Sequence, residues 1–149
     1  MPQRDGKNNM TVTMLGNLAL SGTTPASSDW FDTREFDMVT LVPVTDVVTD
    51  AGTADGFSFV VEESNTTAAA DATAVANAQL IGSESDLTVT SDAADDTVAG
   101  GIGYRGTKRY VRLTATGTTG TDANVKVLGI GNAAEIQPST FVGTSVAAT

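Results

Sequence analysis

A short basic segment carries the residues whose type and spacing best suit chemical recognition. The stretch Gly103–Thr114 holds four of the eight Lys and Arg residues of the chain: Arg105, Lys108, Arg109 and Arg112. The chain as a whole is acidic, with a formal net charge of −10. A guanidinium can hold a carboxylate through two parallel hydrogen bonds, which adds orientation to attraction. Tyr110, between two of these cations, would extend such a contact with apolar surface.

Two interpretations of this segment stay open. The cations could pair with some of the 18 Asp and Glu residues of their own chain, or they could contact an acidic surface on a partner. On a strand, Lys108, Tyr110 and Arg112 would share one face, because side chains alternate between the two faces. The candidates for a partner interface are therefore Arg105, Lys108, Arg109, Tyr110 and Arg112, together with Phe141 and Val142 near the end of the chain.

Catalytic chemistry has little support in the composition. The chain has no histidine and no cysteine, which removes the usual general base near neutral pH, the usual zinc ligands and any disulfide. Asp29, Asp32 and the pair Glu62-Glu63 could supply the acid and base of a glycosidase. Such an enzyme also needs an aromatic sugar platform, and the chain has eight aromatic residues in all. We expect no enzymatic activity and no cofactor.

Two further motifs have plainer explanations than a ligand site. Asp92, Asp95 and Asp96 lie in a loop that could bind calcium through oxygen ligands, but their spacing is not that of an EF-hand. We favour a solvated loop and expect no metal, although cation binding there stays open. The glycine-rich stretch Gly100–Gly106 precedes a strand rather than a helix, so we expect tight turns with positive φ angles instead of a phosphate site.

Charge and hydropathy limit the classes of partner that the protein could bind. Nucleic-acid binding needs concentrated Lys and Arg, which an acidic chain with a pI of about 4.1 lacks. No run approaches the roughly 20 apolar residues of a membrane-spanning helix, and Met10–Leu20 is too interrupted for a secretory signal. We therefore expect a soluble protein, made in a cytoplasm, that binds neither nucleic acid nor membrane.

Short apolar runs separated by Gly-rich turns predict an all-β fold. We expect an antiparallel β-sandwich, jelly-roll-like, over residues 10–137, with an N-terminal arm over 1–9 and an extended C-terminal arm over 138–149. The strongest strand signal, Phe36–Val48, is apolar on both parities, which predicts that both of its faces are covered. At Pro43 we expect this strand to end, to form a β-bulge or to reach a sheet edge.

Two other stretches show which side chains should face the core. Phe57, Phe59 and Val61 alternate with polar residues and should point inward. Val111, Leu113 and Ala115 do the same within the predicted strand Lys108–Thr116. The adjacent pair Trp30-Phe31 suggests a core anchor at the entry of a strand rather than a platform for a ligand.

Four pieces of the chain, in order, resemble small structural proteins of tailed bacteriophages. Gly103–Arg112 is similar to their G-Y-x-G-x-K-R-Y-V-R segment, and Asp32–Phe36 resembles their D-T-x-x-F motif. Phe57–Ser64 resembles a hydrophobic strand followed by Glu-Ser, and Val127–Gly129 resembles the end of a strand before a Pro-containing tail. The resemblance covers about residues 30–138.

The resemblance implies a capsid decoration protein, also called a cement or auxiliary head protein. Such a protein would sit on the virion surface, bind the major capsid protein and neighbouring copies of itself, and stabilise the icosahedral shell without catalysis. The alternative is a head- or tail-associated β-sandwich adhesin that binds a host-surface glycan. That alternative needs an exposed aromatic platform, for which Trp30 is the one tryptophan available.

Overall fold

Alternation of apolar and polar residues builds two antiparallel sheets in residues 9–134, the part of the chain that the structure, a computed structural model, describes. Sheet A has the order β1 (Met10–Ser21), β10 (Asp122–Ala134), β4 (Phe36–Asp50), β8 (Ile102–Tyr104) and β7 (Leu80–Ile81). Sheet B has the order β2 (Ala26–Ser27), β9 (Tyr110–Thr116), β5 (Ser58–Ser64) and β6 (Thr73–Ala74), and β3 (Phe31–Asp32) also pairs with β9.

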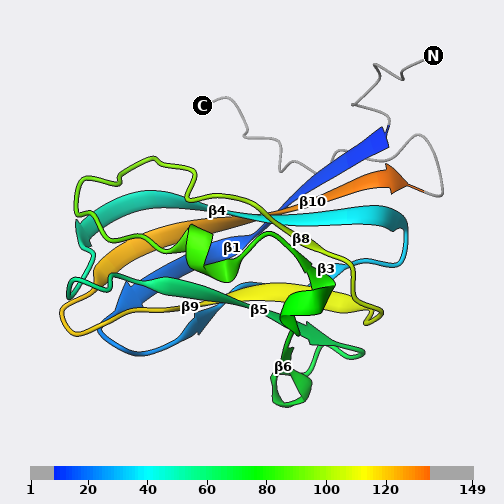
Figure 1. Ribbon diagram of the computed structural model, residues 1–149, viewed down its shortest axis with the longest axis horizontal. Helices are drawn as coiled ribbons and strands as arrows, with labels where there is room; N and C mark the ends of the chain where they lie inside the picture. The colour runs from blue at the N-terminus through cyan, green and yellow to red at the C-terminus, as the bar shows by residue number, and fades with distance from the viewer. Residues whose placement is uncertain (1–8, 135–149) are drawn as a thin grey trace, which may run out of the picture.

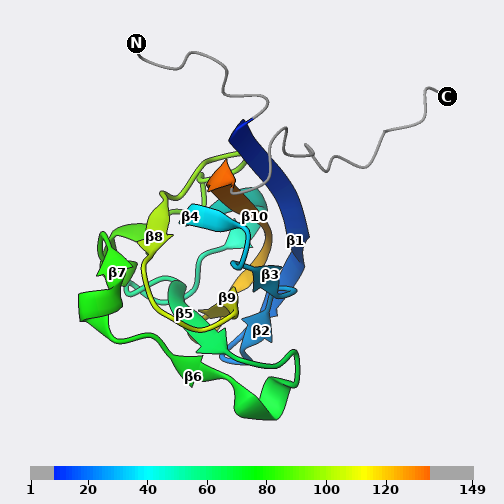
Figure 2. The same cartoon turned by 90° about the vertical axis from the view of Figure 1, so that its right-hand side faces the viewer.

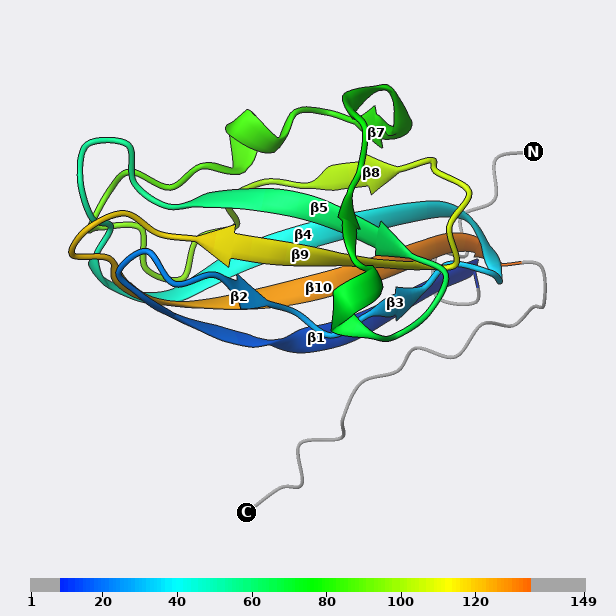
Figure 3. The ribbon, with the colours of Figure 1, turned by 90° about the horizontal axis from the view of Figure 1, so that it is seen from below.

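The two sheets lie face to face as a sandwich, which confirms the predicted all-β class (Figures 1 and 3). The jelly-roll connectivity stays a prediction, as do the two terminal arms, since the N-terminal arm up to Asn8 and the whole C-terminal arm lie outside the described residues. Three 3₁₀ turns, Ala69–Asp71, Asn77–Gln79 and Glu84–Leu87, are the named helical elements of residues 9–134. None of them has the length and apolar character needed to cross a membrane.

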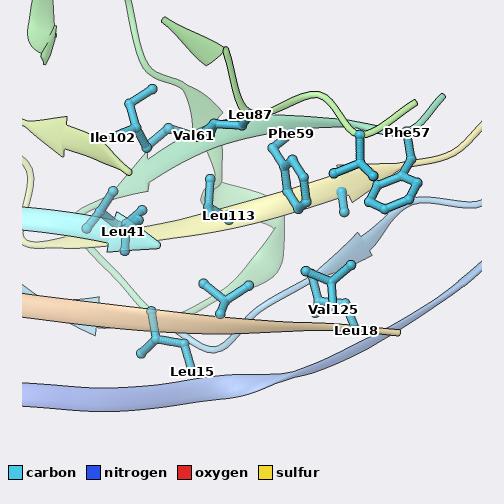
Figure 4. Packing of buried hydrophobic residues seen from close by; sticks show 14 of the residues in the cluster. Leu15, Leu18, Leu41, Phe57, Phe59, Val61, Leu87, Ile102, Leu113 and Val125 are labelled. Atoms are coloured by element: carbon cyan, nitrogen blue, oxygen red, sulfur yellow. The ribbon is translucent and has the colours of Figure 1, made fainter. Parts of the chain in front are cut away.

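The core fills the space between the sheets. The inward side chains predicted for β5, for Phe57 just before it and for β9 are confirmed, and each is at most 2% exposed: Phe57, Phe59, Val61, Val111, Leu113 and Ala115. Sheet A contributes Leu15, Leu41 and Val125 from the opposite side, and Figure 4 shows these side chains pointing toward those of sheet B. The Phe57 and Phe59 rings meet edge to face at 6.0 Å.

β4 differs from its prediction in two ways. The strand continues through Pro43. The Pro43 carbonyl accepts a hydrogen bond from the Ala99 amide at 3.0 Å, so the polar backbone groups of this residue face the loop at Ala99 and not β10. The lack of an amide hydrogen on proline therefore removes no hydrogen bond between β4 and β10. The outer face of β4 is also not covered by the described residues. Val39 and Leu41 point inward and are buried, whereas Met38 points outward and is 55% exposed.

The prediction that Trp30 and Phe31 anchor the core is confirmed for Phe31 and wrong for Trp30. Phe31 is 4% exposed and stacks on Phe36 with ring centroids 5.6 Å apart. Gly129 makes room for this ring, because a Cβ there would lie 2.5 Å from a Phe31 ring carbon. Trp30 instead lies half-buried on the outside of sheet B, since successive residues of an extended chain point to opposite faces.

Candidate partner-binding surface

The basic segment crosses from one sheet to the other. β8 of sheet A ends at Tyr104, β9 of sheet B begins at Tyr110, and residues 105–109, here called the basic loop, connect them. Figure 2 faces this end of the sandwich and shows the connection running from β8 down to β9. The basic loop therefore presents its cations at one end of the molecule rather than along a strand face.

Hydrogen bonds to buried and half-buried groups fix the path of the basic loop. The Tyr104 hydroxyl donates to Oε2 of Glu63 at 2.6 Å and accepts from the Lys108 amide at 3.0 Å. The Thr33 hydroxyl donates to the carbonyls of Lys108 and Arg109 at 3.1 and 2.9 Å. At the start of the loop, the Arg105 amide donates to the Gln79 carbonyl at 2.9 Å. Both ends of the loop are thus held to the sandwich.

Gly106 lets the loop fold over Tyr104. A Cβ at Gly106 would lie 2.4 Å from the ζ carbon and the hydroxyl oxygen of Tyr104, a distance that real contacts essentially never show. The prediction of positive φ angles in the stretch Gly100–Gly106 is confirmed for Gly100, whose φ is 156°, and is wrong for Gly106, whose φ is not positive. Its role is close approach to the ring.

Asp32 joins two arginines beside the loop. Its Oδ2 lies 3.0 Å from Nη2 of Arg109 and 3.1 Å from Nη2 of Arg34. Burial tends to raise the pKa of Asp32, but the hydrogen bonds from Arg109 and Arg34 and the charge of Arg109 outweigh it, so the pKa lies below its ordinary value. Arg109 also stacks over the Tyr110 ring at 4.7 Å. Arg109 is therefore largely engaged within its own chain.

Arg112 is engaged even more fully, and it lies apart from the loop. Its Nε lies 2.8 Å from Oε2 of Glu62, its guanidinium lies 4.4 Å above the Trp30 ring, and its side chain is 12% exposed. Glu62 also accepts from the Thr114 hydroxyl at 2.9 Å, and the Trp30 indole donates to the Thr67 carbonyl at 3.0 Å. These contacts form a network on the outer face of sheet B.

Arg105 and Lys108 differ from these two arginines. The ion pairs within residues 9–134 join Arg34 and Arg109 to Asp32, Arg112 to Glu62, and Lys126 to Asp46. No carboxylate in that range pairs with Arg105 or Lys108. Arg105 does donate from Nε to the Ala78 carbonyl at 3.2 Å. These two cations keep the most capacity for an external anion.

A cavity of about 380 Å³ opens beside the basic loop. Its lining comes from the start of β4, the segment before it, the residue after β5, the end of β8 and the basic loop: Thr33, Arg34, Phe36, Asp37, Val39, Asn65, Tyr104, Arg105, Gly106, Thr107, Lys108 and Arg109. Four of these residues are cationic and one is an acid. A carboxylate or another small anion would find complementary charge here.

The structure thus gathers Arg105, Lys108 and Arg109 at one cavity and separates Arg112 from them. Tyr110 begins β9 and is half-buried beneath the Arg109 guanidinium, outside the lining of the cavity. Phe141 and Val142 lie outside the described residues. Of the four carboxylates considered for catalysis, Asp32 and Glu62 form ion pairs with arginine.

The acidic loop does more than meet solvent, because its carboxylates cap a sheet edge. Asp95 accepts the amide of Val48 at 2.7 Å, and Asp92 accepts the amide of Ala51 at 2.8 Å. On the side away from β10, no strand of sheet A pairs with β4 along this stretch, so these oxygens replace the missing ladder partners. Within residues 9–134, no group of three or more Asp, Glu, His or Cys residues is arranged to hold a metal ion.

Two residues that hold the loop, Glu63 and Thr33, were not predicted to belong to the partner interface. The parity of β5 carried a signal for one of them. Phe57, Phe59 and Val61 point inward, so Glu63 must follow them into the interior, where it is 9% exposed. A buried acid needs a partner, and Tyr104 supplies it. Thr33 lies in the D-T-x-x-F motif, but nothing in the sequence pointed to its contacts, which are with backbone carbonyls 75 and 76 residues away.

Comparison of the chain with protein-family models, with curated proteins and with solved structures finds no match.

Proposed function

We propose that this protein is a virion structural protein that decorates and stabilises the icosahedral capsid of a tailed bacteriophage. It binds the major capsid protein and neighbouring copies of itself, and it acts by lending surface rather than by catalysis. The observation that carries the proposal is the basic loop at one end of an acidic sandwich. Its cations Arg105 and Lys108 have no carboxylate partner among residues 9–134.

The charge distribution supports attachment through this end. Because the chain has a net charge of −10, most of its surface should repel an acidic surface on a partner. The basic loop adds positive charge at its end of the molecule, and a cavity of about 380 Å³ lies beside it. An acidic side chain on the capsid shell would therefore orient the protein with the basic loop toward the shell.

The mechanical role follows from bridging. A packaged genome pushes the shell outward, so a cement protein must add binding free energy across the joints between subunits. One interface of standard size buries about 800 Å² on each partner. A second contact of the same anchored molecule is effectively intramolecular, so two modest contacts together hold a joint strongly. The hydrogen-bonded anchoring of the basic loop suits such a load, because few of its groups need ordering on binding.

The test uses purified protein and empty expanded heads. Wild-type protein should bind the heads and raise their melting temperature at saturation. Lys108→Glu should weaken binding about tenfold, or 1.4 kcal/mol, and the difference from wild type should shrink toward 1 M salt, where the Debye length falls to about 3 Å. The matched control is Lys126→Glu, which makes the same change of charge at a residue paired with Asp46 on sheet A.

Three results would count against the proposal. Saturated heads that melt at the same temperature as bare heads would remove the cement role. Equal loss of binding in Lys108→Glu and Lys126→Glu would remove the basic loop as the contact. Binding that is insensitive to salt in both variants would point to an apolar contact elsewhere. Urea unfolding of each variant shows that the fold is retained.

A glycan-binding adhesin is the second candidate, and one cavity favours it. A space of about 230 Å³ is lined by Trp30, Asp32 and Glu35 among others, a combination that suits a sugar. The Arg112 guanidinium already covers one face of the Trp30 ring, which leaves less of it for stacking. Binding to a glycan array that is lost in Trp30→Ala would support this candidate, and a silent array would remove it.

A further inference from the structure

The outer face of sheet A carries apolar side chains on four of its strands, with the polar residues Thr40, Lys126 and Asn132 among them. Its outward residues include Val12 and Met14 of β1, Leu128 and Ile130 of β10, Met38 and Val42 of β4, and Ile81 of β7. Met14, Met38 and Ile81 are 51%, 55% and 61% exposed. An antiparallel sheet usually turns polar residues to solvent on its outer face, so a face of this composition indicates that something covers it.

Strand register places these residues in adjoining rows across the sheet, with Thr40 and Gly103 between the apolar positions of the first row. Val12 pairs with Ile130, Ile130 with Thr40, Thr40 with Gly103, and Gly103 with Ile81, so a row runs across the sheet. The next row runs from Met14 through Leu128 to Val42. A groove of about 350 Å³ lies on the same face, lined by Asp37, Met38, Val39, Thr40, Ile81, Gly101, Gly103, Tyr104, Arg105 and Asn132.

The chain leaves the described structure beside this groove. Asn132 lines it and pairs with Met38, and Ala134, where β10 ends, pairs with Phe36. Residues 135–149 follow directly, and fully extended they could span about 50 Å. The five strands of sheet A, at about 4.8 Å spacing, span roughly 20 Å. The C-terminal segment 135–149 is therefore long enough to cross the face from the point where it starts.

The composition of the C-terminal segment matches the face. It carries Ile136, Phe141, Val142 and Val146, and Glu135 is its one charged side chain. The N-terminal residues 1–8 fit less well, since they include Arg4, Asp5 and Lys7 in a mostly polar stretch.

From this match we infer that the C-terminal segment 135–149 folds back over the outer face of sheet A of its own chain, with Phe141 and Val142 packed on the apolar rows. The covalent connection favours the segment of the same chain, because it holds the segment near the face at a high effective concentration. The inference also accounts for the residue pattern of β4, which is apolar on both parities although the described residues cover one face.

The absence of cysteine from the chain allows a clean distance measurement. Spin labels at Thr40→Cys and Thr140→Cys would report the separation between the centre of the face and the segment. We expect a separation within about 20 Å, the width of the five-stranded sheet A, that is unchanged when labelled protein is diluted into excess unlabelled protein. The control pair Ser27→Cys and Thr140→Cys starts from the outside of sheet B, so its separation should exceed the first by about 10 Å, the distance between sheets.

A second pair of variants tests the apolar contact itself. Phe141→Asp with Val142→Asp should release the segment and lengthen the distance between positions 40 and 140. Thr144→Asp with Ser145→Asp adds the same charge at polar positions and should leave that distance short. A distance that is long and broad in the wild-type background overturns the inference. A short distance that disappears on dilution also overturns it, because the covering segment then belongs to a neighbouring copy.

Discussion

The Tyr104 hydroxyl donates a 2.6 Å hydrogen bond to Oε2 of Glu63, and this bond joins β8 of sheet A to β5 of sheet B. The same hydroxyl accepts the Lys108 amide, so one oxygen links both sheets and the basic loop. Glu63 is 9% exposed and Tyr104 is 5% exposed. The bond therefore satisfies a buried acid and positions the cations of the loop at once.

Removing this hydroxyl should destabilise the fold and loosen the loop. Tyr104→Phe leaves Glu63 and the Lys108 amide without a partner, so we expect a loss of about 1.5–3 kcal/mol in the free energy of unfolding, measured in urea. Tyr110→Phe is the matched control, since no hydrogen bond joins its hydroxyl to residues 9–134. Similar losses in the two variants would contradict the structural role given to Tyr104.

The stability of the protein should fall at alkaline pH because of the same residue. Burial, and next the hydrogen bond to Glu63 and its negative charge, raise the pKa of Tyr104 above its ordinary value of 10.0. Above pH 10 the unfolded chain releases this proton while the folded protein keeps it. The contribution of Tyr104 is thus present below pH 10 and is lost as the pH rises toward the folded-state pKa. Unfolding free energies between pH 9 and 11 should fall more steeply for wild type than for Tyr104→Phe, and parallel curves would refute the assignment.

The two halves of the basic segment should respond differently to truncation. Arg112→Ala removes a half-buried ion pair with Glu62 and a stacking contact with Trp30, so we expect a loss of about 1–2 kcal/mol in stability. Lys108→Ala removes no ion pair within residues 9–134 and should change stability by less than about 0.5 kcal/mol. Thermal or urea unfolding measures both. Equal effects would mean that the segment acts as one folding element.

The sequence predicted the parts of this fold that depend on local alternation. Phe57 to Val61 and Val111 to Ala115 alternate between apolar and polar residues, and both point inward as expected. The bond between Tyr104 and Glu63 could not be predicted, because it joins residues 41 apart on different sheets. The same limit applied to Arg112. With 18 acidic residues in the chain, spacing alone could not distinguish Glu62 from a carboxylate on a partner.

Carboxylates that accept backbone amides at the sheet edges should stabilise the fold through geometry. Glu84 accepts the amide of Val61 at 2.7 Å on the edge of β5, as Asp95 does for Val48 on β4. Glu84→Ala leaves that amide unpaired and should cost about 1–3 kcal/mol. Glu84→Gln keeps an acceptor oxygen and should cost less. The urea midpoints of the two variants decide the matter, and equal losses would show that the charge rather than the acceptor is required.

Two glycines near the basic loop should differ in their tolerance of a methyl group. Gly106→Ala places a Cβ 2.4 Å from the Tyr104 ring, and the ring is fixed by its bonds to Glu63 and Lys108, so we expect a loss of about 1–3 kcal/mol through overpacking. Gly101→Ala meets its nearest atom, a methyl of Thr40, at 3.6 Å, which is an ordinary contact, and should be nearly neutral. Urea unfolding compares the two variants directly. In the background of Tyr104→Ala, which removes the ring, Gly106→Ala should lose its effect, because the clash is with that ring. A Gly106→Ala penalty that persists there would place its cause in the backbone of the loop instead.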